Sequence, residues 1–335
     1  MRKYLGLCIL ALLVVVLSAC GEQSKEEVVK ELDSKLENME GYKAQASMNL
    51  KTGEKSQTYN IDIWHKKKNY YRVLLKNDND EKGNQVILRN DDGVFVLTPA
   101  LNKSFKFKSD WPDNTSQPYL YQSLVKDIKN DSEATFKSTE KYYVFETKTN
   151  YQNNNNLPFQ EIYFDKKTYT PVKVKVLDKE KNSLVEVNFS KFKLNPEFAK
   201  DDFQIEKNMT SGVTGVPTMA EDQPTNFSVL YPMNELNAEL VETKEVELED
   251  GKRVILSYEG EKNFTLMQER VESYPASAPT TVKGEPINLG FTVGAITSNS
   301  IEWNYNGTNF YLASEDLTRE EMIDVASSVQ GKEVK

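Results

Sequence analysis

Apolar residues recur every three or four positions in two stretches of the chain. In residues 24–39 they include Val28 and Leu32, set among lysines and glutamates. This spacing predicts an amphipathic helix, which Gly41 would end. Residues 118–128 repeat the spacing and predict a second helix.

Apolar and polar residues alternate through much of the chain up to residue 206. Tyr59, Ile61 and Ile63 alternate with polar neighbours, and turn sequences such as Asp91-Asp92-Gly93 separate successive segments. Short connections favour antiparallel pairing, because parallel strands need long crossovers. We therefore expect a large antiparallel sheet curled around the two helices. The predicted strands are residues 42–50, 57–66, 69–76, 85–89, 94–98, 104–108, 142–149, 161–165, 172–177 and 183–192.

The pattern breaks at residues 207–226, where glycines and prolines stand among small polar residues, and we interpret this stretch as a linker. Residues 227–335 then predict a small α+β domain. Its closing helix has Thr318 as cap and Glu321 completing a capping box. A two-residue hairpin is expected around Asn306 and Gly307. The predicted strands are residues 227–230, 246–248, 254–258, 263–271, 287–293, 301–304 and 309–312.

The chain begins like an exported protein. The apolar run at residues 5–17 reaches about 20 Å at roughly 1.5 Å per residue, short of the roughly 30 Å hydrocarbon core of a bilayer. We therefore predict a signal peptide at residues 1–19 and no mature transmembrane helix. The sequence Leu17-Ser18-Ala19-Cys20-Gly21 resembles the lipobox of bacterial lipoproteins. That resemblance implies cleavage before Cys20 and attachment of diacylglycerol and an acyl chain such as palmitate. The alternative is an ordinary signal peptide with a chance cysteine.

Charge and cysteine content bear on how the mature chain meets a membrane. Removing Arg2 and Lys3 leaves 40 basic residues of 42 against 51 acidic ones, a net charge of −11. Such a body is repelled by nucleic acid and by anionic headgroups, so the lipid on Cys20 must hold it at the membrane. Cys8 leaves with the signal peptide, so no disulfide can form within the mature body. The predicted location is the extracytoplasmic face of the cell membrane.

Residues suited to catalysis or metal binding are scarce. The single histidine, His65, lies in a strand-like segment without a partner nucleophile, and we predict that it ends a strand at a sheet edge. One histidine and one lipidated cysteine cannot make a zinc site. The sequence Asp78-Asn79-Asp80-Glu81-Lys82-Gly83 faintly resembles a calcium loop, but Lys82 and Arg89 occupy ligand positions. We expect a hairpin turn there, and no catalytic, cofactor-binding or metal-binding residues in the chain.

Aromatic residues are abundant, with 17 Tyr, 15 Phe and 3 Trp, and many lie in predicted strands. Most should form the core or cross-strand pairs. The remainder could line a cavity for an apolar ligand or contact a partner protein.

Three segments resemble parts of the lipoprotein-carrier fold shared by LolA, LolB and the N-terminal domain of the anti-sigma regulator RseB. The first, residues 92–99, runs Asp-Gly, strand, Pro and continues through Lys103 to a second strand. The second, residues 163–174, has a strand, Asp165, a turn, Pro171 and a strand. The third, residues 189–205, is similar to the closing strand and its extension.

This resemblance implies a first domain, residues 20–206, that is an open half-barrel whose concave apolar face is covered by the two helices. The fold class is thus mainly β (α+β): a curved antiparallel half-barrel sheet, LolA-like, followed by a small α+β domain. The whole chain also resembles Gram-positive membrane lipoproteins associated with sporulation or germination. Carrier activity does not transfer with the fold, because this chain would itself be anchored.

Two functions remain open. The first is a non-enzymatic, membrane-tethered binding module for a protein partner or an apolar ligand. The second is a lipid or lipoprotein carrier, or chaperone, that uses the half-barrel cavity. An enzyme is the least supported class, because no nucleophile or metal set can be assembled from the residues present.

Overall fold

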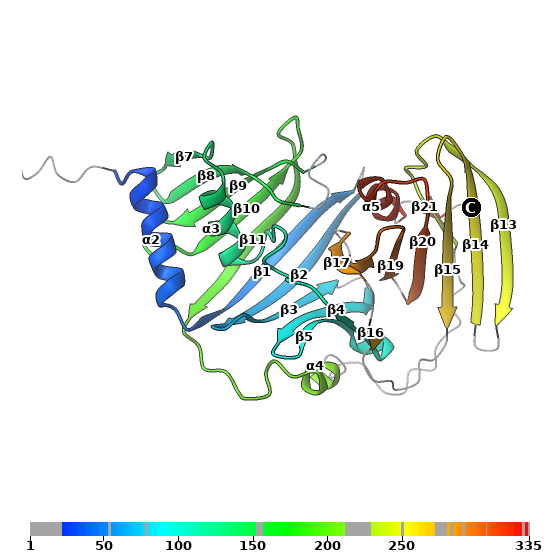
Figure 1. The fold of residues 1–335 in the computed structure, drawn as a ribbon. Coiled ribbons are helices and arrows are strands. Elements are labelled where there is room, and N and C mark those ends of the chain that lie inside the picture. The colour runs from blue at the N-terminus through cyan, green and yellow to red at the C-terminus, as the bar shows by residue number, and fades with distance from the viewer. Residues whose placement is uncertain are drawn as a thin grey trace, which may run out of the picture.

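The computed structural model describes residues 22–52, 55–77, 80–151, 157–211, 229–248, 251–271, 280–281, 284–289, 292–305, 307–329 and 332–333. A twelve-stranded sheet and a seven-stranded sheet make up most of this part of the chain, one toward each end of the molecule (Figure 1). Neither sheet closes into a barrel. The mainly β, antiparallel fold class predicted from the alternation is confirmed.

The larger sheet has the order β16-β6-β5-β4-β3-β2-β1-β11-β10-β9-β8-β7. Its neighbours pair antiparallel except β16, which runs parallel to β6. Ten of its strands match predicted ones, and β7 and β16 were not predicted. The strands are β1 (Gly41–Thr52), β2 (Lys55–Lys66), β3 (Tyr70–Asn77), β4 (Asp80–Asn90), β5 (Gly93–Thr98), β6 (Lys103–Phe107), β7 (Thr135–Ser138), β8 (Tyr142–Lys148), β9 (Phe159–Asp165), β10 (Pro171–Leu177), β11 (Ser183–Leu194) and β16 (Thr280–Thr281).

Helices α2 (Lys25–Asn38) and α3 (Tyr121–Asn130) cover one face of this sheet (Figure 1). Ser24 begins α2 with a capping box, in which its hydroxyl accepts from the Glu27 N–H and the Glu27 carboxylate accepts from the Ser24 N–H. This box satisfies two backbone donors that a helix start leaves unpaired. Both predicted helices are therefore present. Their buried side chains pack into the same core as the strands beneath them.

The opposite face of the sheet is covered by the segment that leaves β11. Val73 belongs to the core under α2 and α3, whereas its neighbour Leu74 packs on the other face with Phe203. Successive side chains of a strand point to opposite faces of the sheet, which explains why Val73 and Leu74 belong to different clusters. The segment ends in α4 (Ile205–Ser211), whose Met209 packs on the same cluster. Residues 207–211, expected to begin a linker, are thus helical, and residues 212–226 lie outside the described part.

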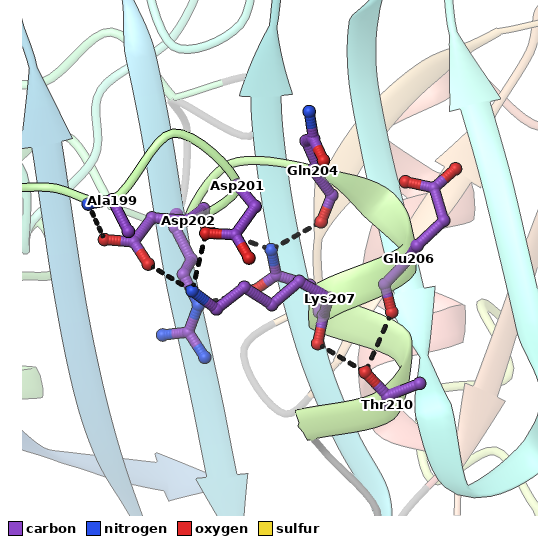
Figure 2. Close-up of polar contacts among 9 residues, drawn as sticks. Ala199, Asp201, Asp202, Gln204, Glu206, Lys207 and Thr210 are labelled. Atoms are coloured by element: carbon purple, nitrogen blue, oxygen red, sulfur yellow. Dashed lines mark hydrogen bonds and ion pairs between the residues drawn. The ribbon is translucent and has the colours of Figure 1, made fainter.

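Polar side chains fasten α4 to the sheet. The Lys207 ammonium lies between the carboxylates of Asp201, at 2.9 Å, and Asp202, at 2.7 Å (Figure 2). Behind it, the buried Asn208 side chain accepts from Arg72 Nε at 2.6 Å and donates to the Asp202 carbonyl at 3.1 Å. Arg72 stands on β3, so this bond joins the helix directly to the sheet.

The smaller sheet has the order β13-β14-β15-β20-β19-β18-β17 and is antiparallel throughout. Helix α5 (Arg319–Ser328) packs on it and begins with the predicted capping box of Thr318 and Glu321. Short strands β12 (Leu230–Tyr231) and β21 (Lys332–Glu333) pair separately. The seven strands are β13 (Ala238–Leu248), β14 (Gly251–Gly260), β15 (Phe264–Val271), β17 (Glu285–Asn288), β18 (Val293–Ile296), β19 (Ser300–Tyr305) and β20 (Thr308–Ala313).

Two local predictions need correction. Residues 287–293 form the end of β17 and the start of β18 rather than one strand, and the Leu289 N–H donates to the Thr292 carbonyl across the turn. His65 lies near the end of β2, but β2 is an internal strand between β1 and β3. The histidine is buried against the rings of Tyr42 and Tyr71 instead of standing at an edge.

Candidate functional site

Strand β13 is one of the two edges of the smaller sheet. It pairs along its length with β14 on one side and has no strand on its other side in the part of the chain that the structure describes. A bulge interrupts the pairing between Leu240 and Glu242. Residues 239–245 are all exposed, so this run is hereafter the edge site. Backbone donors and acceptors along such an edge are available to an added strand.

The edge site is exposed on both faces because the hydrophobic core of the smaller sheet ends at the neighbouring strand, β14. On β14 the alternating residues Val254, Leu256 and Tyr258 are buried, whereas β13 carries no buried residue after Ala238. Strand β13 therefore extends beyond the layer that α5 covers. The strand extends further into the acidic segment than residues 246–248, which were all that the sequence pattern predicted.

The side chains of the edge site mix apolar and acidic groups. Leu240 and Val241 are 39% and 53% exposed, which is high for large apolar residues in a folded chain. The carboxylates of Glu239, Glu242 and Glu245 stand beside them, with Lys244 as the one basic residue of the run. Such a surface fits an extended segment that carries basic side chains.

Contacts between the two sheets fix the position of the smaller sheet, which carries the edge site. Gln85 on β4 is buried, and its Oε1 accepts from the Val293 N–H at 2.7 Å while its Nε2 donates to the Val293 carbonyl at 3.2 Å. Thr292 Oγ1 donates to the same Oε1 at 3.1 Å. The smaller sheet is thereby tied to the larger one through buried hydrogen bonds.

Lys103 on β6 adds a charged contact at the same junction. Its ammonium donates to Asn309 Oδ1 and lies 3.4 Å from Asn304 Oδ1. Burial lowers the pKa of Lys103 to about 8, against the opposing effect of the Glu302 and Glu269 carboxylates. The Lys103 ammonium at this junction therefore loses its proton under mildly alkaline conditions.

The space beneath α2 and α3 is filled by side chains. Tyr42, Tyr121 and Phe192 form one aromatic cluster, with Tyr42 and Phe192 stacked at 4.8 Å between ring centroids. Tyr42 and Tyr121 are fully buried. His65 borders the cluster, and burial lowers its pKa to about 4. The face of the larger sheet under α2 and α3 is thus covered by the protein's own buried side chains.

A buried carboxyl lies at the other side of α3. Asp127 Oδ2 accepts from Ser116 Oγ and from Gln160 Nε2, each at 2.7 Å. Burial raises the pKa of Asp127 to about 6, although both hydrogen bonds act in the opposite direction. These partners join α3 to β9 and to the segment before the helix, so the cluster fixes the position of the helix.

The predicted lipidation residue, Cys20, lies outside the described residues, as do Asp78 and Asn79 of the sequence that faintly resembles a calcium loop. Lys82 and Gly83 belong to β4, and Asn77 pairs with Asp80 across a hairpin. Among the described residues no group of three His, Cys, Asp or Glu side chains lies close enough to hold a metal ion. No helix in the described ranges has the length and apolar character needed to cross a bilayer.

Comparison with known proteins gives the family. The profile described as "Sporulation protein YdcC-like" matches residues 2–203. The chain is also 50% identical to "Sporulation protein YdcC" of Bacillus subtilis (strain 168), over all of this chain and 99% of the relative. The chain belongs to the sporulation protein YdcC-like family. This assignment confirms the resemblance to a sporulation-associated group, and the family and the relative are described by sporulation rather than by a reaction.

Two solved structures with similarity to this chain come from other bacteria. The MucA/MucB complex of Pseudomonas aeruginosa contains a chain with 14% identity and a TM-score of 0.35, covering 90% of this chain and 97% of that one. A LolA superfamily protein, NE2245 from Nitrosomonas europaea, has 12% identity and a TM-score of 0.31 and covers 55% of this chain and 99% of its own.

Proposed function

We propose that this protein is an extracytoplasmic lipoprotein, anchored through Cys20, that acts in sporulation without catalysis by binding a protein partner at the edge site. One observation carries the proposal: seven consecutive residues of β13 are exposed, including Leu240 and Val241, and no strand of the described chain pairs with the outer side of β13. The partner would add an extended segment to β13 as a further strand.

Charge favours a basic partner segment over a second copy of the chain. Two edge sites brought together would place several glutamates near one another, which destabilises antiparallel pairs. A segment with lysines or arginines would instead face the carboxylates of Glu239 and Glu242, while Glu245 is already ion-paired with Lys252 on β14. The bulge at Leu240 and the acidic side chains together disfavour indiscriminate pairing of this edge.

The proposed partner site can be tested by photo-crosslinking in cells that make the protein. A photoreactive amino acid at Val241 should give a single adduct with another protein, while the same group at Thr135 should not. Thr135 is a matched control because it is exposed on β7, the edge strand of the larger sheet. Absence of an adduct at Val241, or equal adducts at both positions, contradicts the proposal.

Charge reversal then tests the chemistry of the partner. The double variant Glu239→Lys, Glu242→Lys should abolish the adduct, because it reverses the two exposed carboxylates of the edge site other than Glu245, which is paired with Lys252. Glu197→Lys, Glu206→Lys makes the same change in net charge at exposed positions away from β13 and should leave the adduct intact. An adduct with the mass of two copies of this chain would instead identify self-association. Acyl lipid that co-purifies with a form of the protein lacking the covalent lipid on Cys20 would favour the carrier function.

The anchor has its own test. Cys20→Ser should be recovered outside the membrane fraction, in the extracytoplasmic space, whereas the native protein should remain in the membrane fraction. A variant that stays uncut and equally membrane-bound, or a native protein found in the cytosol, contradicts anchoring through Cys20.

A further inference from the structure

The first described residues are fastened to the body of the protein. Gln23 Oε1 accepts hydrogen bonds from Tyr169 at 2.6 Å and from Tyr143, and the next residue, Ser24, caps α2. Tyr143 lies on β8 and Tyr169 in the turn between β9 and β10. Gln23 is therefore held against the body by these two hydrogen bonds.

This leaves a very short connection to the proposed lipid. Gly21 and Glu22 are the two residues between Cys20 and Gln23. Three steps of about 3.8 Å between consecutive Cα atoms span at most about 11 Å. The polar layer on each side of a bilayer is about 5–8 Å thick, so a body tied this closely to lipid cannot move far from the headgroups.

The surface around Gln23 consists of three neighbouring segments, residues 22–25, 139–143 and 166–169, hereafter the anchor rim. The Lys166 N–H donates to the Lys141 carbonyl at 3.1 Å, and its ammonium lies 4.0 Å from the Glu22 carboxylate. Lys141 and Lys167 are exposed. The rim therefore presents lysines next to the point where the chain leaves for Cys20.

Charge differs between the anchor rim and the strands β13 and β14. The anchor rim has four basic residues against two acidic ones, in a chain whose net charge is −9. Strands β13 and β14, residues 238–248 and 251–260, have five acidic residues against three basic ones. Strand β13 lies at the opposite end of the molecule from α2 (Figure 1). An anionic lipid surface would attract the anchor rim and repel β13 and β14.

We propose that the anchor rim rests on the headgroups of anionic phospholipids, and that the body stands away from the membrane with the edge site at its far end. This inference rests on the proposed lipidation of Cys20. The short connection to Cys20 and the lysines of the anchor rim together hold this one face of the protein against the membrane. A partner of the edge site would then be met at a distance from the bilayer.

Energy transfer to labelled lipid can test this orientation in the full lipidated protein. Because the mature chain has no cysteine besides Cys20, Thr168→Cys on the rim and Glu242→Cys on β13 each give one site for a donor fluorophore. The vesicles would contain equal parts of phosphatidylcholine and phosphatidylglycerol with a headgroup-labelled acceptor. We expect transfer from residue 168 to be several-fold more efficient than from residue 242. Equal transfer, or more from residue 242, overturns the orientation.

Two further variants separate the causes. Inserting a flexible linker of about ten residues after Gly21 should reduce the difference between the two donor positions. Lys141→Glu, Lys167→Glu should reduce transfer from residue 168, whereas Lys200→Glu, Lys244→Glu, with the same change in charge away from the rim, should not. Unchanged energy transfer from residue 168 in the variant Lys141→Glu, Lys167→Glu overturns the role of the lysines.

Flotation with the vesicles distinguishes the two proposals. A native protein that fails to float contradicts lipidation and the orientation together. A protein that floats but gives equal transfer from both positions contradicts the orientation alone.

Discussion

Gln85 on one sheet hydrogen-bonds both backbone groups of Val293 on the other, with its Oε1 accepting at 2.7 Å and its Nε2 donating at 3.2 Å. Both residues are buried, so neither backbone group has water as an alternative partner at this junction. The side-chain amide thus takes the place that a neighbouring strand would occupy. The two sheets consequently depend on one another for stability.

Replacing Gln85 with leucine should therefore destabilise the protein by about 3 kcal/mol, because two buried backbone groups lose their partners. Chemical denaturation of the lipid-free protein measures this change. Gln45→Leu is the matched control, since Gln45 is exposed on β1 and should cost less than about 0.5 kcal/mol. A loss at Gln85 no larger than at Gln45 would show that the junction contributes little.

Asp127 should make stability depend on pH in a predictable direction. Its pKa is about 6 in the folded protein against 3.8 in the unfolded chain, so the folded state holds the proton more tightly. Stability from this group is present below pH 3.8 and is lost as the pH rises through about 6. At pH 8, Asp127→Asn should be more stable than the native protein by up to about 3 kcal/mol, and the difference should vanish near pH 4.

Asp131 provides the opposite case on the same helix end. Burial raises its pKa, but hydrogen bonds from the N–H groups of Lys148 and Glu133 outweigh burial and lower it overall. Asp131→Asn should therefore be less stable than the native protein at neutral pH, and the difference should shrink in acid. Denaturation curves at several pH values compare the two variants, and the same sign for both would contradict the assignment.

Gly41 faces the backbone of β2 at very close range. A Cβ atom at this position would stand 2.3 Å from the His65 carbonyl oxygen, so Gly41→Ala must push two paired strands apart. We expect a loss of about 3 kcal/mol. Gly307 has a φ of 73° and open space around it, so Gly307→Asn, which tolerates that backbone conformation, should cost less than about 1 kcal/mol. Thermal denaturation of both variants checks the contrast.

The bond between Arg72 and Asn208 should control how firmly α4 is held. Asn208→Ala leaves the Arg72 Nε–H without its partner at 2.6 Å and removes the donor to the Asp202 carbonyl. Amide exchange in residues 205–211 should become about tenfold faster or more, the equivalent of about 1.4 kcal/mol. Thr210→Ala, at an exposed position of the same helix, should leave exchange nearly unchanged. Comparable acceleration in both variants would contradict the role of Asn208.

Local signals in the sequence predicted most of the fold, and contacts between distant residues account for what was missed. The capping boxes at Ser24 and Thr318 and the alternation in β2 depend on neighbours within a few residues, and the structure confirms them. Helix α4 has one short apolar stripe and is stabilised by the bond to Arg72, which is 136 residues away. Nothing near residue 208 in the sequence indicates that partner.

The edge site was missed for a related reason. The apolar residues of β13 do not alternate regularly with polar ones, because the strand covers no core and alternation is a signal of burial on one face. Pairing with the strongly patterned β14 makes it a strand. The prediction for His65 was right about the end of an alternating segment and wrong about the sheet edge. Whether β2 lies inside the sheet depends on its pairing with both β1 and β3.

The parallel pairing of β16 with β6 makes completion of the larger sheet depend on a late part of the chain. Thr280 and Thr281 complete the outer side of a sheet whose other eleven strands lie within residues 41–194. Until those two residues join the sheet, the outer side of β6 has no strand beside it among the described residues. Newly made molecules would then be vulnerable to pairing with one another, and holding the unfinished protein apart from its copies would matter most in that interval.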